Sequence, residues 1–121
     1  MDSAMPQTLA DDQGDLLRLL GYIYLQNDRP SQAVILFHAI HVLDPNDSGI
    51  AKSLACAYLR SGKPEDAVPL LDTLLARGDA SPLTHLLRGQ ALARMGRPDE
   101  SSISMRCFIR ARAGLGTLEG R

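Results

Sequence analysis

The sequence predicts an all-α protein, folded as a right-handed solenoid of three helical hairpins. A basic residue followed by proline recurs at 29–30, 63–64 and 97–98, a step of 34 residues each time. Apolar residues make up 45% of the 121 residues and aromatic residues only 4%, as suits helices rich in Leu and Ala. A fixed period of this length is typical of stacked supersecondary units.

Five sets of positions keep the same 34-residue register. They are Gly21, Ala55 and Gly89; Tyr24, Tyr58 and Leu92; Ala33, Ala67 and Ser101; Phe37, Leu71 and Met105; and Ile40, Leu74 and Phe108. This is the tetratricopeptide pattern of a small residue before an aromatic one, then Ala-x3-Phe, then Pro. The small residues are expected to let the two helices of a hairpin approach closely.

Six helices are predicted, in pairs: 14–27 with 30–43, 48–61 with 64–77, and 82–95 with 98–112. Pro30, Pro64 and Pro98 each open the second helix of a pair, where a missing N–H costs nothing. The basic residue before each proline is pushed out of the helical conformation, which makes the turn. Asp44-Pro45 and Gly78 end the first two hairpins.

The predicted three-repeat domain covers residues 14–112, between a disordered tail at 1–13 and a flexible tail at 113–121. Pro69 lies inside a predicted helix, where its missing hydrogen bond is expected to produce a kink. No further helix is expected over the last hairpin, so Ile103, Cys107 or Ile109 would be partly exposed or covered by a partner.

Charge is distributed unevenly along a chain whose net charge is −1. Residues 1–47 carry seven acids against Arg18 and Arg29, and residues 88–121 carry seven arginines against three acids. This asymmetry is either ordinary surface solvation or a polarised docking surface. The balanced total does not point to nucleic acid. We find neither a signal peptide nor an apolar run long enough to insert in a membrane.

No residue cluster predicts catalysis, a cofactor or a metal, and we expect no enzyme. His38 and His41 stand three apart on one helix, but no third ligand has the spacing that zinc requires. The turn Ser61-Gly62-Lys63-Pro64 lacks the glycine spacing of a phosphate-binding loop. Cys56 and Cys107 are expected to be buried thiols rather than a disulfide framework, which favours a reducing compartment.

The first helix of each hairpin is expected to line the concave side of the solenoid. The predicted partner-binding residues are Arg18, Tyr22, Leu25, Lys52, Cys56, Leu59, Leu86, Gln90 and Ala93. They would form an apolar groove with cationic edges at Lys52, Arg60 and Arg94, suited to an amphipathic helix or an extended apolar segment with some acid. Alternatively, several of them complete the core between repeats. We expect Leu59→Glu to weaken partner binding more than fold stability. Tyr22 and Cys56 replace the Asn donors of a chaperone carboxylate clamp, which argues against that mode.

Residues 16–47, LLRLLGYIYLQNDRPSQAVILFHAIHVLDPND, resemble the YscY (SctY) chaperones of bacterial type III secretion, and the similarity continues more weakly to residue 112. The shared features are Gly21, the pair Leu25-Gln26, the segment from Ala33 to Leu36, and Leu43-Asp44-Pro45. The resemblance implies a chaperone in the bacterial cytoplasm. Its implied partner is a small export protein like YscX (SctX), held as a heterodimer that engages the export-gate protein.

Two alternatives remain open. The segments VLDPNDS and LACAYLRSGKPEDA also resemble the class II translocator chaperones typified by SycD, although those are longer. A tetratricopeptide adaptor that scaffolds a complex without chaperoning is the third interpretation. In each case the free protein is expected to self-associate through uncovered apolar surface.

Overall fold

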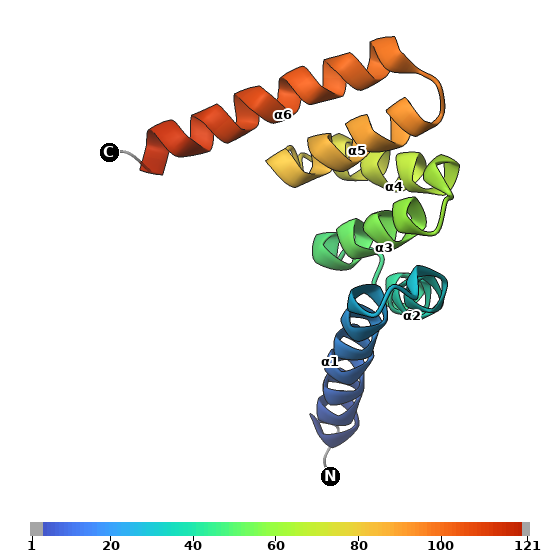
Figure 1. Ribbon diagram of the computed structural model, residues 1–121. Coiled ribbons are helices and arrows are strands. Elements are labelled where there is room, and N and C mark those ends of the chain that lie inside the picture. The colour runs from blue at the N-terminus through green and yellow to red at the C-terminus, as the bar shows by residue number, and fades with distance from the viewer. Residues whose placement is uncertain (1–3, 120–121) are drawn as a thin grey trace.

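The computed structural model describes the backbone of residues 4–119 and the side chains of residues 14–114. Six helices follow one another in this part of the chain: α1 (Ala4–Gln26), α2 (Pro30–Leu43), α3 (Ser48–Arg60), α4 (Pro64–Ala76), α5 (Pro82–Arg94) and α6 (Pro98–Glu119). Each helix packs on the next, and α3 also contacts α5. The three hairpins therefore stack into a helical solenoid, with α1 and α6 at its opposite ends (Figure 1).

The turns inside the hairpins repeat at the level of the backbone. Arg29 and Lys63, which precede the helix-opening prolines, have φ near −120° and ψ of 61°, outside the helical region as predicted. Gly62 and Gly96 have positive φ, and Asp28 takes the same conformation at the equivalent place, with φ of 57°. Left-handed residues are common just after a helix, and glycine adopts that conformation without strain.

The hydrophobic core lies in two clusters along the stack. The first cluster joins α1, α2 and α3 and consists of Leu25, Ala33, Phe37, Ile40, Ile50, Leu54 and Ala57. The second joins α3, α4 and α5 and consists of Ala51, Ala55, Leu59, Ala67, Val68, Leu71, Leu74, Leu87, Ala91 and Leu92. Tyr58 packs against both clusters. Every hairpin thus depends on its neighbour for burial, as expected of a repeat protein.

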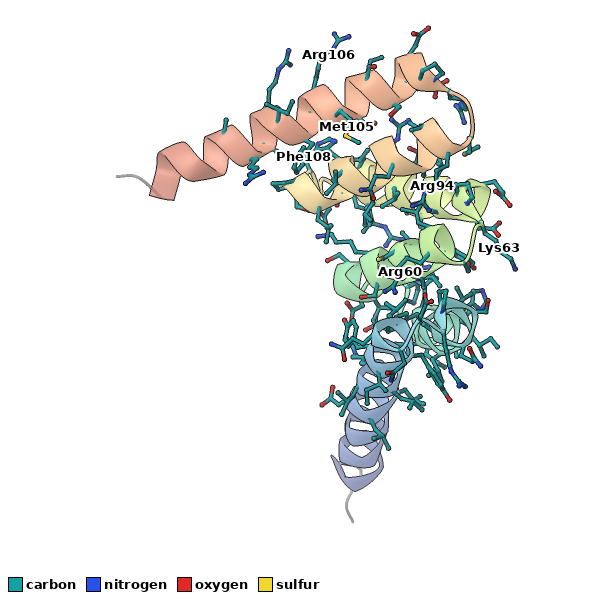
Figure 2. All side chains as sticks on the ribbon, in the orientation of Figure 1. Arg60, Lys63, Arg94, Met105, Arg106 and Phe108 are labelled. Carbon is teal, nitrogen blue, oxygen red and sulfur yellow. The ribbon has the colours of Figure 1, made fainter. Side chains whose placement is uncertain are left out.

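The last hairpin combines apolar packing with polar contacts between α5 and α6. Ser101 stands where the first two repeats have alanine, and its hydroxyl donates to the Gly89 carbonyl at 2.8 Å. Arg88 Nη1 donates to the buried Ser104 hydroxyl at 2.8 Å. Met105 and Phe108 lie between α6 and α5, whereas Arg106 points away from α5 (Figure 2).

The small residues at 21 and 89 sit where the second helix of the hairpin inserts a large side chain. A Cβ on Gly21 would lie 2.6 Å from Phe37 Cε1, and one on Gly89 would lie 2.9 Å from Met105 Cε. Separations below 3.0 Å require something to move. The predicted role of these positions in close helix approach is therefore confirmed.

The terminal helices extend beyond the predicted boundaries. α1 begins at Ala4 instead of 14 and has 23 residues against 14 in α2. Pro6 lies in the first turn, where its missing N–H removes no intrahelical bond. α6 continues to Glu119 through Gly114 and Gly116, each costing about 1 kcal/mol relative to alanine. The segments 1–3 and 120–121 of the predicted tails lie outside the described residues.

α4 is helical on both sides of Pro69. Pro69 is exposed, and its carbonyl accepts a hydrogen bond from the Thr73 hydroxyl at 2.9 Å. The kink expected at this proline stays a prediction.

Candidate protein-binding surface

The nine predicted binding residues lie on α1, α3 and α5, but the structure gives them three different degrees of burial. Tyr22, Gln90 and Ala93 are exposed; Arg18, Lys52, Cys56 and Leu86 are half-buried; and Leu25 and Leu59 are buried, at 8% and 3% exposed. Seven of the nine therefore share an accessible face along the first helices of the hairpins.

Leu25 and Leu59 are core residues, which corrects their assignment to a groove. Leu25 belongs to the cluster around Phe37, and Leu59 to the cluster that contains Ala67 and Leu92. Ala93, at the equivalent place in α5, is exposed. The same position is thus covered in the first two repeats and open in the third. For these two leucines the alternative interpretation, completion of the core, is correct.

The two cations of the predicted groove are engaged in a contact that repeats along the stack. Arg18 Nη2 donates to Asp47 Oδ2 at 2.5 Å, and Lys52 Nζ lies 3.0 Å from Asp79 Oδ2. Each pair links the first helix of one hairpin to residues at the start of the next. Arg18 and Lys52 therefore link neighbouring repeats, and Lys52 is not a free cationic edge of the groove.

Both carboxylates also organise the start of the helix that follows them. Asp47 Oδ1 caps α3 by accepting the Ile50 amide at 3.1 Å. Asp79 Oδ1 accepts the Ser81 amide at 3.2 Å and the Thr84 hydroxyl at 3.3 Å. In the third repeat the position of Arg18 and Lys52 is occupied by Leu86, which is apolar and cannot form such an ion pair.

These contacts perturb the two carboxyl groups in the same direction. Burial of Asp47 opposes its ionisation, but the Ile50 amide and the Arg18 guanidinium outweigh burial and hold the pKa of Asp47 below its usual value. Burial likewise opposes ionisation of Asp79, and Lys52 together with Ser81 lowers the pKa of Asp79 overall. Both groups consequently favour their charged forms in the folded protein.

Tyr22 is an aromatic anchor on this face. Its ring lies against Phe37, with centroids 5.3 Å apart and a tilt of 58°. Its hydroxyl is 3.1 Å from Ser53 Oγ on α3. A side chain that is held at both ends and still 43% exposed has little conformational entropy left to lose.

Further apolar side chains that the sequence interpretation omitted extend this accessible face. Leu19, three residues before Tyr22, is 56% exposed, and Leu83, three residues before Leu86, is 48% exposed. We call the surface formed by Leu19, Tyr22, Cys56, Leu83, Leu86, Gln90 and Ala93 the first-helix face. Its members in α5 are Leu83, Leu86, Gln90 and Ala93, which are three or four residues apart. This helical spacing would have allowed Leu83 to be predicted from the sequence.

The arginines near the ends of α3 and α5 border the first-helix face. Arg94 Nη1 donates to the Leu59 carbonyl, which joins α5 to α3. Arg60 is exposed and lies 3.9 Å from the Asp28 carboxylate, a loose contact that leaves its charge accessible. Figure 2 shows both residues on their helices.

A hollow of about 350 Å³ lies elsewhere, among α2, α3 and α4. It is lined by His38, His41, Leu54, Tyr58, Asp66, Pro69, Leu70 and Thr73, none of which was predicted to bind a partner. Burial raises the pKa of Tyr58, and the nearby Asp66 charge adds to this. Across the described side chains no three of His, Cys, Asp and Glu come together as a metal site would require.

Comparison with known proteins identifies the architecture. The tetratricopeptide repeat family matches residues 53–101. A solved structure titled MamA MSR-1 C2 superposes with a TM-score of 0.74 at 17% sequence identity, covering 89% of this chain and 63% of that one. This chain thus spans less than two thirds of the length of that structure. No curated protein matches the sequence significantly.

Together, the 34-residue repeat, the stacked hairpins and these matches show a helical solenoid with tetratricopeptide-like repeats. Within the described helices, none is both long and apolar enough to cross a membrane.

Proposed function

We propose that this protein binds a segment of another protein along the first-helix face and acts as its chaperone. The observation that carries the proposal is the row of accessible apolar side chains across three successive hairpins. Leu19 and Tyr22 lie at one end of the row, and Leu83 and Leu86 at the other. Scattered exposed leucines need no explanation, but a row that crosses separate helices is typical of a docking surface.

The chemistry of this face favours an amphipathic helix or an extended apolar segment that also carries acidic residues. Cys56 and Ala93 are small and leave room for a partner side chain. The exposed guanidinium of Arg60 at the border favours a carboxylate. Arg18 and Lys52 contribute less than the sequence alone indicated, because Asp47 and Asp79 already neutralise them.

For the identity of the partner we propose a small export protein of bacterial type III secretion, like YscX (SctX), bound in the cytoplasm as a heterodimer. The resemblance of residues 16–47 to the YscY (SctY) chaperones supports this proposal. By the same resemblance, the complex would go on to engage the export-gate protein. The class II translocator chaperones, and an adaptor without chaperone activity, are the competing assignments.

Co-expression tests the partner. We expect a tagged YscX-like protein to be insoluble alone and to elute with this chain as a soluble one-to-one complex in size exclusion. If a large translocator is retained instead, the protein belongs with the class II chaperones. If neither protein is retained but a multiprotein complex fails to assemble without this chain, the adaptor assignment holds.

Matched variants test the surface. The double variant Tyr22→Ala/Leu86→Glu changes two accessible residues at opposite ends of the first-helix face. Ile35→Glu is the control, because Ile35 is 68% exposed on α2, away from that face. We expect the double variant to lose the complex and the control to retain it. Equal binding by both would move the site off the first helices.

A further inference from the structure

α1 carries an apolar stripe that remains exposed in the single chain. Leu16, Leu20 and Ile23 are 64%, 36% and 40% exposed, and their spacing places them along one side of the helix. They lie beside the first-helix face but on a different line of the helix from Tyr22. Exposed apolar side chains in a row along one helix are costly in a free molecule.

The repeat explains what this stripe is. Leu16, Leu20 and Ile23 are equivalent, one 34-residue period later, to Ile50, Leu54 and Ala57 of α3. Those three are 0%, 1% and 0% exposed, because they pack in the cluster that contains Phe37 and Ile40 of the preceding hairpin. Ala91, the equivalent of Ala57 in α5, is also fully buried. The α1 stripe is therefore the surface with which each hairpin of this chain packs onto the second helix before it.

α6 offers the complementary surface at the other end of the stack. Arg106 and Ile109 are exposed, and Figure 2 shows Arg106 pointing away from α5. One period earlier, Asp72 and Leu75 on α4 occupy these places, and Asp72 Oδ1 accepts a 2.7 Å hydrogen bond from Arg88 of α5. The outer side of α6 thus corresponds to the side of α4 that contacts the next hairpin.

The charges of the two surfaces are opposite. Arg106, Arg110 and Arg112 are exposed on α6, and no ion pair engages them among the described side chains. Asp15 is exposed on α1 one residue before the stripe, and the sequence carries Asp11 and Asp12 in the preceding turn. Within one chain, Asp72 of α4 contacts Arg88 of α5. If α6 of one copy met α1 of the next in the same way, the equivalent residues Arg106 and Leu20 would be in contact. Because the paired helices are antiparallel, the later arginines then lie toward Asp15.

We propose that the α1 stripe docks on the outer side of α6 of a second copy of this chain, so that copies stack head to tail. The contact continues the repeat-on-repeat packing already present within one copy, and α1 and α6 lie at opposite ends of the stack (Figure 1). Such a contact is heterologous, so it does not close at a dimer unless the rotation forms a ring. This inference does not depend on the proposed chaperone function.

Two blocked variants test the proposal. The head-blocked variant carries Leu16→Glu/Leu20→Glu, and the tail-blocked variant carries Arg106→Glu/Ile109→Glu. Ile35→Glu again serves as the control, because its exposed position does not belong to either surface. All four altered positions are accessible, and the circular dichroism of each variant should match that of the parent chain.

Sedimentation velocity over a concentration series is the measurement. We expect the parent chain and the control to form species larger than dimers as concentration rises, and each blocked variant to remain a monomer. An equimolar mixture of the two blocked variants should form a dimer and nothing larger, because one supplies the free stripe and the other the free α6 surface. Raised salt should weaken the association.

Three results would overturn the proposal. A parent chain that stays monomeric throughout the series has no such contact. A tail-blocked variant that still dimerises would mean that two α1 stripes pack on each other. A mixture that stays monomeric would mean that the stripe does not recognise α6, and that another protein covers it.

Discussion

The Cβ position of Gly21 lies 2.6 Å from Cε1 of Phe37, so the first hairpin closes over a residue that has no side chain. Phe37 is fully buried in the cluster that joins α2 to α3. The ring cannot retreat without disturbing the contact between the first and second repeats. The contact between Gly21 and Phe37 therefore couples the packing of α1 on α2 to the stacking of the second hairpin on the first.

Gly21→Ala should destabilise the protein, although alanine is the better helix former by about 1 kcal/mol. The added methyl group forces the Phe37 ring to move in a packed core, which costs about 1–3 kcal/mol. Urea unfolding followed by circular dichroism measures the net loss. Gly89→Ala is the matched control, because its methyl group meets the flexible end of Met105, and we expect it to be neutral or stabilising. Equal losses in both variants would contradict this account.

Asp28→Gly should stabilise the protein by up to about 1 kcal/mol, because a side chain is disfavoured at its φ of 57°. The second and third repeats already use glycine there. The lost contact with Arg60 contributes little, since the Asp28 side chain is 95% exposed. The midpoint of thermal unfolding reports the change. Asp28→Ala keeps the Cβ and should not stabilise; a gain from alanine as large as that from glycine would refute a backbone cause.

Leu59→Glu should unfold or severely destabilise the chain, because it buries an unpaired charge in a cluster where Leu59 is 3% exposed. We expect a loss of about 3 kcal/mol or more. Ala93→Glu, at the equivalent and exposed place in α5, should change stability by less than about 0.5 kcal/mol. Thermal unfolding of the two variants decides the matter. A folded Leu59→Glu protein of ordinary stability would return Leu59 to the binding surface.

Acid should loosen the stack through Asp47 and Asp79. The pKa of each group is lowered in the folded protein from the ordinary value of 3.8, so the folded state binds fewer protons than the unfolded state. Their contribution to stability is therefore present above that value and lost as the pH falls through the lower folded-state value. Unfolding free energies measured across acid pH should fall in the parent chain and vary less in Asp47→Asn/Asp79→Asn. An unchanged slope in the variant would assign acid sensitivity to other groups.

The fold could be predicted from the sequence because the determinants of each hairpin are local and repeated. Proline fixes the start of α2, α4 and α6, and the small residue at 21 or 89 marks where the helices approach. The burial of Leu25 and Leu59 could not be predicted in the same way. When apolar residues lie on two sides of a helix, their spacing does not show which side packs against the neighbouring repeat. Only the packing of the next repeat distinguishes Leu59 from Ala93, which share a register.

The neutralised cations illustrate a second limit. Arg18 and Lys52 have the spacing of groove residues, but each is paired with a carboxylate 29 or 27 positions further along the chain. Such a pairing depends on the path of the loop between hairpins, which the 34-residue pattern does not specify. The α1 stripe was missed for the opposite reason. The sequence signal is the equivalence of Leu16 with Ile50 and of Leu20 with Leu54, which lies outside the five sets of positions that define the repeat.

Site-specific crosslinking tests the central claim, partner binding on the first-helix face, most directly. A photoreactive residue placed at Gln90 lies on that face, and one placed at Ile35 lies on exposed α2 surface away from it. With the co-purified partner, we predict crosslinks from Gln90 and none from Ile35. Crosslinks from Ile35 alone would contradict the account and place the partner on the opposite side of the solenoid.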